Sequence, residues 1–322
     1  MRAIVQHRYG GPEVLALGEV DAPTPSADEV LIRVQAVAVS AGDALIMRGE
    51  PRAVRLAFGL RHPKRPTIGR DVAGVVEGVG PAVTRFRVGD PVYAESDQGG
   101  YAELVAVPQG FVARRPANLD ATHAAAVPVS ATTALQGWRL ADIGPGRHVL
   151  VNGASGGVGG FAVQLAKAMG AEVTGVCRGA KAEHVLAIGA DHVVDYTRDD
   201  FTEATHRYDA VFDLVADRSL SRIRRTLTPR GTLVLSSGTG GAVFGPFGRI
   251  IRASFMNPFV AQQLRPLAAR RSGDDLAELT RRIEAGEVTP VVDRTYPLAQ
   301  ASQALADFES GVVRGKLVLV VE

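Results

Sequence analysis

One stretch constrains the fold more than any other. Residues 151–170, VNGASGGVGGFAVQLAKAMG, crowd five glycines into positions 153–160. Glycine inside a regular element costs roughly 0.5–1 kcal/mol relative to alanine, so such a cluster indicates a backbone that something approaches closely. An apolar run, RHVLVNGA, precedes the cluster, and a segment with helical spacing follows and ends at Gly170, a residue suited to a C-cap. The stretch therefore predicts a strand, a glycine-rich turn and a helix.

The turn matches the dinucleotide-binding pattern G-x-G-x-x-G, with alanine in the first position. In this pattern Gly156 lets the backbone approach a pyrophosphate, and Gly159 lets the helix pack closely on the strand. The N-terminus of the helix then offers unpaired N–H groups and a positive dipole to the phosphates. A flexible loop without a ligand is the alternative. The predicted cofactor-binding turn consists of Ala154, Ser155, Gly156, Gly157, Val158 and Gly159.

The residues after the second predicted strand indicate which dinucleotide is bound. An acidic residue about 20 positions after the turn would bind the ribose 2′-hydroxyl of NAD. That region instead holds Cys177, Arg178 and Lys181. A guanidinium pairs with phosphate through two parallel hydrogen bonds, so these cations favour the 2′-phosphate of NADP(H). The alternative for both cations is a solvated position at the start of a helix.

The rest of the chain shows two kinds of pattern. Residues 1–120 contain β-branched strand candidates such as 29–40 and 71–80, separated by turn signals, which indicate a compact barrel or sandwich. Residues 121–284 alternate strand and helix candidates, which is typical of βαβ units and a parallel sheet. From about residue 285 the β character returns, with one helix at 300–311. The predicted fold class is α/β, with a doubly wound Rossmann sheet and a second, β-rich domain.

Composition excludes several classes of function. The 36 Lys and Arg nearly balance the 34 Asp and Glu, and a net charge of +2 gives no reason to expect nucleic-acid binding. No apolar run is long enough for a membrane span, and the N-terminus lacks the apolar core of a signal peptide. The single cysteine excludes an internal disulfide and a cysteine-rich zinc site. We therefore expect a cytoplasmic enzyme. The basic patch at 55–66 is interpreted as a solvated loop, with a cleft rim or a weak membrane-surface contact as alternatives.

Further motifs carry a resemblance to a known family. The chain contains, in this order, PTIGRDVAGVVEGVG, RFRVGDPVYA, GGYAELVAVP, AAAVPVSATTALQGW, IGADHVVDY and GVVRGKLVLV. Together with the glycine turn, these segments resemble the zinc-independent quinone oxidoreductase branch of the medium-chain dehydrogenase/reductase superfamily over almost the whole chain. The resemblance implies a GroES-like β-barrel domain at 1–120, completed by 285–322, and a Rossmann NADP(H)-binding domain at 121–284. It also implies an active site in the cleft between them and a homodimer formed through the Rossmann sheets.

The resemblance implies hydride transfer from NADPH to a small molecule, either a quinone or the C=C bond of an α,β-unsaturated carbonyl compound. Zinc members of the superfamily carry a cysteine in the first active-site loop and a Gly-His-Glu motif. This chain has Ser40 and Asp43 in that loop and Gly69-Arg70-Asp71 at the motif, and no four-cysteine lobe in AESDQGGYAE. Thiolate and imidazole hold zinc, whereas a guanidinium cannot. We therefore expect no metal.

The resemblance also assigns further residues to the cofactor site. One would lie beside the nicotinamide, and two short segments, beginning at Asp213 and at position 236, would line the same face of the cofactor. A tyrosine would pack by the adenosine and its 2′-phosphate, and a lysine would close over the site. The simpler interpretations are a helix cap, a half-buried strand aromatic and a surface lysine. These residues are Thr133, Tyr196, Leu214, Val215, Ser236, Ser237, Gly238 and Lys316.

The group that stabilises the substrate oxygen is left open by the sequence. Many quinone oxidoreductases have Asn and Tyr in the first active-site loop, where this chain has Ser40 and Leu45. The candidates in the substrate pocket are Ser40, Asp43, Arg70 and Tyr101, and Asp43 could equally be a structural hydrogen-bond partner. The missing ligands argue against a zinc alcohol dehydrogenase. An enoyl-thioester reductase of a biosynthetic pathway and a non-catalytic NADPH-binding protein stay open as alternatives.

Overall fold

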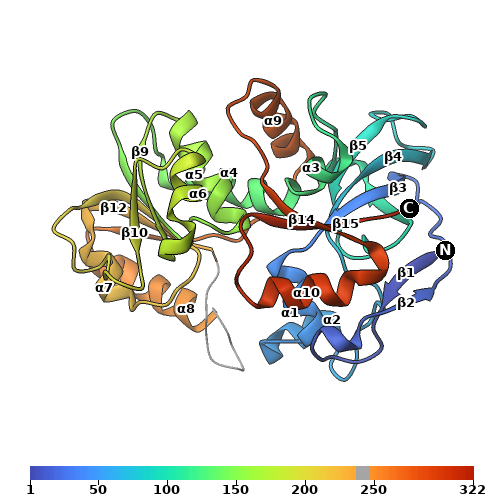
Figure 1. Cartoon of the computed structure of the whole chain (residues 1–322), viewed down its shortest axis with the longest axis horizontal. Helices are drawn as coiled ribbons and strands as arrows, with labels where there is room; N and C mark the ends of the chain where they lie inside the picture. Colours follow the sequence, from blue (N-terminus) through green and yellow to red (C-terminus); the bar gives the residue numbers. More distant parts are fainter. Residues whose placement is uncertain (237–246) are drawn as a thin grey trace. The chain divides into compact units, whose positions relative to one another are not determined.

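The computed structural model describes residues 1–236 and 247–322, which divide into two compact units (Figure 1). Unit 1 comprises residues 1–132, 271–286 and 290–322, and unit 2 comprises residues 133–270 and 287–289. These divisions differ from the expected ones at 120/121 and 284/285. Residues 121–132, with α3 (Ala121–Ala125), and the helix at 273–284 both belong to unit 1.

Unit 2 contains a parallel sheet with strand order β10-β9-β8-β11-β12-β13, and every recorded ladder in it is parallel. This is the order of a doubly wound Rossmann sheet, so the predicted fold of this part is confirmed. The strands are β8 (His148–Asn152), β9 (Glu172–Cys177), β10 (His192–Asp195), β11 (Tyr208–Asp213), β12 (Leu227–Leu235) and β13 (Gln263–Pro266). The helices are α5 (Gly157–Ala168), α6 (Ala182–Ala187), α7 (Leu220–Arg225) and α8 (Phe247–Met256), and α4 (Pro128–Ala141) begins in unit 1.

Two contacts show how the Rossmann sheet is covered. The Trp138 indole packs edge-on against the Phe212 ring, with centroids 5.1 Å apart, and its Nε1 donates a hydrogen bond to the carbonyl of Ala162. A side chain at Gly137 would lie 2.3 Å from the Phe212 ring, so this glycine lets α4 approach the sheet. Because these side chains are buried, they fix α4 against β11 and α5.

The glycine turn after β8 differs from the predicted motif in one respect. The tight turn is made at Gly153, whose φ is +92°, and not at Ala154. Ala154 is fully buried, and its methyl group lies 3.0 Å from where a Cβ of Gly175 would be. The glycine of the tight turn therefore stands one residue before Ala154, the first position of the predicted motif, because a left-handed backbone favours glycine.

Unit 1 is built on a mostly antiparallel sheet with order β14-β15-β3-β4-β5-β7, and β6 also pairs with β3. The last strand, β15, pairs antiparallel with β3, so the C-terminal segment completes the N-terminal sheet as the resemblance implied. The strands are β3 (Glu29–Ala38), β4 (Asp71–Val79), β5 (Pro91–Glu95), β6 (Leu104–Pro108), β7 (Val112–Arg114), β14 (Val292–Pro297) and β15 (Lys316–Val320), with β1 (Arg2–Val5) and β2 (Ala16–Glu19) as a separate pair. The helices are α1 (Ala41–Arg48), α2 (Arg55–Phe58), α3 (Ala121–Ala125), α9 (Gly273–Glu284) and α10 (Ala301–Glu309).

Helix α9 belongs to unit 1, although the sequence predicted residues up to 284 in the Rossmann domain. It buries Leu276, Leu279 and Ile283 in unit 1, and the Leu276 carbonyl accepts a 2.6 Å hydrogen bond from the hydroxyl of Tyr93. At the other end, the Asn118 side chain donates to the carbonyl of Ile283. An amphipathic pattern predicts that a helix has a buried face, but it does not say which sheet that face meets.

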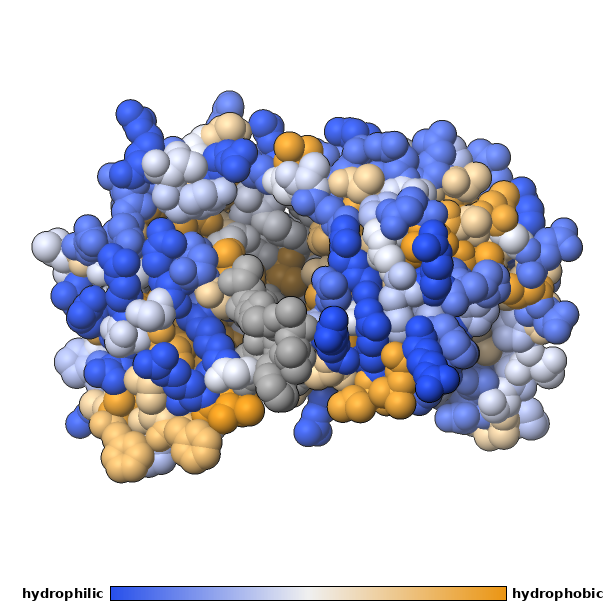
Figure 2. Space-filling view, turned by 90° about the horizontal axis from the view of Figure 1, so that it is seen from below, coloured by the Kyte–Doolittle hydropathy of each residue, from blue (hydrophilic) through white to orange (hydrophobic). Residues whose placement is uncertain are grey.

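Residues 55–66, interpreted as a solvated loop, are mostly exposed, but they begin with the short helix α2. Figure 2 shows polar side chains over most of one face, with hydrophobic side chains gathered in a few patches. Within residues 55–66, Leu56 and Leu60 are exposed, and the guanidinium of Arg55 stacks on the ring of Tyr9. Nη1 of Arg65 lies 3.4 Å from Oδ2 of Asp97. In the described part of the chain, no helix is both long and apolar enough to cross a membrane.

The turn geometry generates a stability prediction. In Gly159→Ala the new methyl group would lie 2.1 Å from the Gly153 carbonyl oxygen, so we expect a loss of about 1–3 kcal/mol despite the helix propensity of alanine. The matched control is Gly156→Ala, whose methyl group meets nothing closer than 3.5 Å and should cost less than about 1 kcal/mol. Urea unfolding of both variants measures the difference. Equal unfolding free energies would contradict the close packing at Gly159.

Candidate functional site

The first part of the site is the glycine turn between β8 and α5. Gly156 is the N-cap of α5, is exposed, and has no capping side chain. A Cβ at this position would face open space except for the Gly153 oxygen at 3.5 Å. The first N–H groups of a helix lack intrahelical partners, and the helix dipole adds positive potential there. The half-buried Ser155, Gly157 and Val158 lie beside this open face, so the turn fits a pyrophosphate.

Four of the predicted residues lie at or near the end of β9. Cys177 is buried, and burial raises the pKa of its thiol, so only its backbone is available to a ligand. Its carbonyl accepts a 3.1 Å hydrogen bond from the backbone of Tyr196, whose side chain is 43% exposed. Arg178 is exposed and Lys181 is half-buried. Tyr196 follows β10 and is not part of the strand, so its interpretation as a half-buried strand aromatic is wrong.

Sequence reasoning missed an acid at this edge. Asp195 ends β10, in register with Cys177 of β9, and accepts hydrogen bonds from the backbone and hydroxyl of Thr197. A Cβ at Gly179 would lie 2.3 Å from its carboxylate. Hydrogen bonds from Thr197, and from the Gly179 backbone, lower the pKa of Asp195, so it is ionised at neutral pH. Asp195 comes from the neighbouring strand β10, whereas the acid expected of an NAD site would follow β9. The negative charge of Asp195 would disfavour a 2′-phosphate at this edge of the sheet, whereas the positive charges of Arg178 and Lys181 would favour one.

Asp213 has a structural role at the end of β11. It is fully buried, and its Oδ1 accepts from the Asn152 amide at 2.8 Å and from the Ala216 backbone at 3.0 Å. The Arg249 guanidinium lies 2.6 Å from its Oδ2. These contacts tie β8 to β11 and fix the turn in which Ala216 takes a φ of +61°. Asp213 therefore shapes the turn that carries Leu214 and Val215.

The other predicted cofactor residues of unit 2 are placed as follows. Leu214, Val215 and Ser236 are half-buried at the carboxyl ends of β11 and β12. Thr133 lies in the middle of α4, so the alternative that it caps a helix is wrong. Two predicted positions, Ser237 and Gly238, lie outside the described residues.

Lys316 is buried in unit 1. Its Nζ donates a 3.0 Å hydrogen bond to Oδ2 of Asp71, and both residues are almost inaccessible to solvent. Oδ1 of Asp71 accepts from the backbone of Val129 at 2.5 Å. The interpretation of Lys316 as a surface residue is therefore wrong. Its contact with the cofactor stays a prediction.

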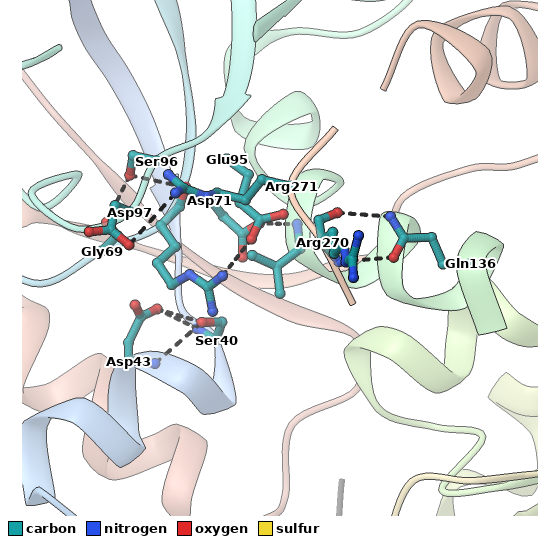
Figure 3. Close-up of polar contacts among 12 residues, drawn as sticks. Ser40, Asp43, Gly69, Asp71, Glu95, Ser96, Asp97, Gln136, Arg270 and Arg271 are labelled. Carbon is teal, nitrogen blue, oxygen red and sulfur yellow. Dashed lines mark hydrogen bonds and ion pairs between the residues drawn. The ribbon is translucent and has the colours of Figure 1, made fainter. Parts of the chain in front are cut away.

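Three of the four substrate-pocket candidates bind one another in unit 1. Ser40 is the N-cap of α1 and forms a capping box with Asp43, and Figure 3 shows the two joined at the start of the helix. Oδ2 of Asp43 accepts from the Ser40 backbone at 2.9 Å, the Ser40 hydroxyl at 2.8 Å and the Tyr101 hydroxyl at 3.4 Å. All three residues are buried. Asp43 is thus a structural hydrogen-bond partner that fixes the start of α1.

Among the four candidates, Arg70 combines a charged side chain with access to solvent. Its side chain is 29% exposed, and its Nη2 lies 2.5 Å from Oε1 of Glu95. Its Nη1 lies 3.2 Å from where a Cβ of Gly42 would be, so the guanidinium rests on the first turn of α1. A guanidinium has five N–H donors in a fixed plane, and the recorded bond to Glu95 uses one of them.

Burial raises the pKa of two carboxyl groups beside Arg70. The pKa of Asp43 rises to about 6, mainly through burial and then through the negative charge of Asp71. The pKa of Glu95 rises to about 7, because burial outweighs the opposing charge of Arg70. Sequence reasoning did not single out Glu95, and its strand position in PVYAE gives no signal of this neighbourhood.

The donor set around Arg70 does not fit zinc. Ser40 is engaged in the capping box, and Arg70 carries a permanent positive charge paired with Glu95. Among residues 1–236 and 247–322, no group of three or more His, Cys, Asp or Glu side chains could hold a metal ion.

Comparisons with known proteins agree with this geometry. Residues 26–117 match the family model of the alcohol dehydrogenase GroES-like domain, and residues 188–319 match the model described as zinc-binding dehydrogenase. The quinone oxidoreductase of Lama guanicoe is 32% identical over 334 residues, covering 100% of this chain and 98% of the relative. The chain belongs to the quinone oxidoreductase branch of the medium-chain dehydrogenase/reductase superfamily.

Two further members of the superfamily are informative. The chloroplastic NADPH-dependent alkenal/one oxidoreductase of Arabidopsis thaliana is 32% identical over 336 residues, covering 99% of this chain and 79% of that relative. The structure of the Escherichia coli quinone oxidoreductase complexed with NADPH superposes with a TM-score of 0.86 at 27% identity, covering 99% of this chain and 100% of that one. The GroES-like fold of unit 1 and the Rossmann fold of unit 2 are thus confirmed.

The buried carboxyl of Asp43 generates a prediction on stability against pH. Its pKa is raised from 3.8 to about 6 in the folded protein, so its stabilising contribution is complete below pH 3.8 and is lost as the pH rises through about 6. The loss is on the order of 3 kcal/mol at about 1.4 kcal/mol per pKa unit. We expect the unfolding free energy of Asp43→Asn, relative to wild type, to improve by this order between pH 4 and pH 7.

Chemical denaturation across this pH range measures that difference. The exposed Asp21→Asn serves as the control and should follow wild type. A constant difference between Asp43→Asn and wild type across the range would show that Asp43 does not titrate in this window.

Proposed function

We propose that this protein is an oxidoreductase that transfers hydride from NADPH, without zinc, to a quinone or to the C=C bond of an α,β-unsaturated carbonyl compound. The observation that carries the proposal is Arg70, an accessible guanidinium in the Gly69-Arg70-Asp71 motif, where zinc members have histidine. The names of the relatives, an alkenal/one oxidoreductase and a quinone oxidoreductase, support both substrate classes.

NADP(H) is the cofactor, and the residues of unit 2 fit it. The open turn at Ser155–Val158 would hold the pyrophosphate at the N-terminus of α5. Arg178 and Lys181 would bind the 2′-phosphate, and Tyr196 would pack beside the adenosine. The residues assigned to the nicotinamide side are Thr133, Leu214, Val215 and Ser236. The NADPH complex of the Escherichia coli relative supports this assignment.

Bound NADPH supplies the hydride, and the chain's own residues handle the charge that hydride transfer creates. Reduction of an enone or a quinone places negative charge on the substrate oxygen. Arg70 would donate hydrogen bonds to this oxygen, and a preorganised donor in a site of low dielectric stabilises the developing charge. The capping box of Ser40 and Asp43 holds the helix turn on which Arg70 rests, so the donor does not need to reorganise.

The cofactor assignment predicts a preference for NADPH. We expect NADPH to bind at least tenfold more tightly than NADH, because charge-assisted hydrogen bonds to a 2′-phosphate contribute about 1.5–3 kcal/mol. In Arg178→Ala this preference should fall while NADH affinity stays constant. Fluorescence titration with both cofactors measures this preference.

Gly156→Val should remain folded but lose NADPH binding, since its side chain would occupy the open face of the turn. Wild-type affinity in Gly156→Val would reject the turn as the cofactor site.

The reaction assignment predicts turnover without a metal. Oxidation of NADPH, followed by its absorbance, should occur with members of a panel of quinones, enones and enoyl thioesters, and chelators should leave the rate unchanged.

 Elemental analysis of the purified protein should find no stoichiometric zinc. The panel also separates the alternatives, because an enoyl-thioester reductase would favour the thioesters. Binding of NADPH with no turnover of any panel member would indicate a non-catalytic NADPH-binding protein. A full equivalent of zinc would reject the metal-free mechanism.

A further inference from the structure

Glu95 and Arg70 are both anchored in the sheet of unit 1. Glu95 ends β5, directly opposite Asp71 of β4 in the antiparallel register. The backbone of Arg70 is fixed by Ser96, whose N–H donates to the Arg70 carbonyl at 2.8 Å and whose hydroxyl donates to the Gly69 carbonyl at 3.0 Å. Figure 3 shows Glu95 and Ser96 close to Asp71 and Gly69. Glu95 is therefore the last residue of β5, and Arg70 is the residue directly before the paired strand β4.

The other carboxylates near Arg70 already have partners. Asp43 accepts from Ser40, and Asp71 accepts from Lys316. Within residues 1–236 and 247–322, the recorded ion pair of Arg70 is with Glu95, whose side chain is 7% exposed. Glu95 is thus the group that can set the direction of the guanidinium, and it leaves the remaining N–H donors of Arg70 for a ligand.

We propose that Glu95 is a positioning residue for the reaction: its carboxylate holds the Arg70 guanidinium against the first turn of α1 in the orientation that binds the substrate oxygen. This inference rests on the proposed function, in which Arg70 stabilises the negative charge on that oxygen. When Glu95 is protonated the ion pair is lost, Arg70 is held less firmly, and the reaction slows.

The groups around Glu95 set the pH at which this occurs. Arg70 and Arg271 favour its ionised form, whereas burial and the charge of Asp71 favour its protonated form. The balance raises the pKa of Glu95 to about 7. The ion pair is therefore complete above neutral pH and is lost as the pH falls below about 7.

The test compares the pH profiles of kcat/KM for wild type and Glu95→Gln, which keeps the shape but not the charge. We expect Glu95→Gln to lower kcat/KM about tenfold at pH 8, to leave NADPH affinity unchanged and to remove the fall in kcat/KM below pH 7. Glu95→Asp should restore the pH dependence. The control is Glu77→Gln, which breaks the exposed ion pair with Arg33 on the same sheet and should behave as wild type. A wild-type profile in Glu95→Gln would overturn the inference.

A second measurement does not depend on turnover. The Glu95 carboxyl can be titrated by carbon NMR, in wild type and in Arg70→Met, with thermal unfolding as a check on folding. We expect the midpoint to rise by at least about one pH unit in Arg70→Met, because the opposing positive charge is gone. An unchanged midpoint would overturn the pairing. An inactive wild type with the expected shift would instead reject the proposed function and leave the ion pair supported.

Discussion

A carboxylate without access to water organises unit 1. Asp71 joins three segments that lie far apart in the sequence. It belongs to β4, and its buried carboxylate accepts hydrogen bonds from Lys316 of β15 and from the backbone N–H of Val129 at the start of α4. Removing one partner of a buried ion pair costs about 3–5 kcal/mol, because the other charge stays buried and unpaired. The position of Arg70, the preceding residue, therefore depends on the same contacts.

The neighbourhood of Asp71 holds a cluster of charged groups that differ in their access to solvent. Asp43, Asp71 and Glu95 are buried carboxyls, and Lys316 and Arg70 supply the opposing charges. Lys316 is buried with its partner, whereas Arg70 retains access to solvent. The Lys316–Asp71 ion pair is thus enclosed in unit 1, whereas the Arg70–Glu95 ion pair leaves the guanidinium partly exposed.

The glycines in the turn of unit 2 differ in how closely they are packed. Gly153 makes the left-handed turn, and Gly159 allows the helix to approach the turn more closely than a side chain permits. Gly156 contributes an open face and has no packing role of this kind. Neighbouring glycines in one motif therefore serve different physical needs, and a substitution at each should fail for a different reason.

The sequence by itself determined the Rossmann pattern and the return of the C-terminal strand, because these features are local or carried by ordered motifs. The cofactor turn and the cations after β9 stay predictions from the same kind of local pattern. It placed Arg70, but it could not distinguish Arg70 from Ser40, Asp43 and Tyr101, since residue type does not reveal access to solvent. It missed Glu95 and Asp195, which reach their neighbours across strands. Only the tertiary structure decided which of these groups are buried and which are paired, because burial, and pairing between strands distant in sequence, exist only in the folded chain.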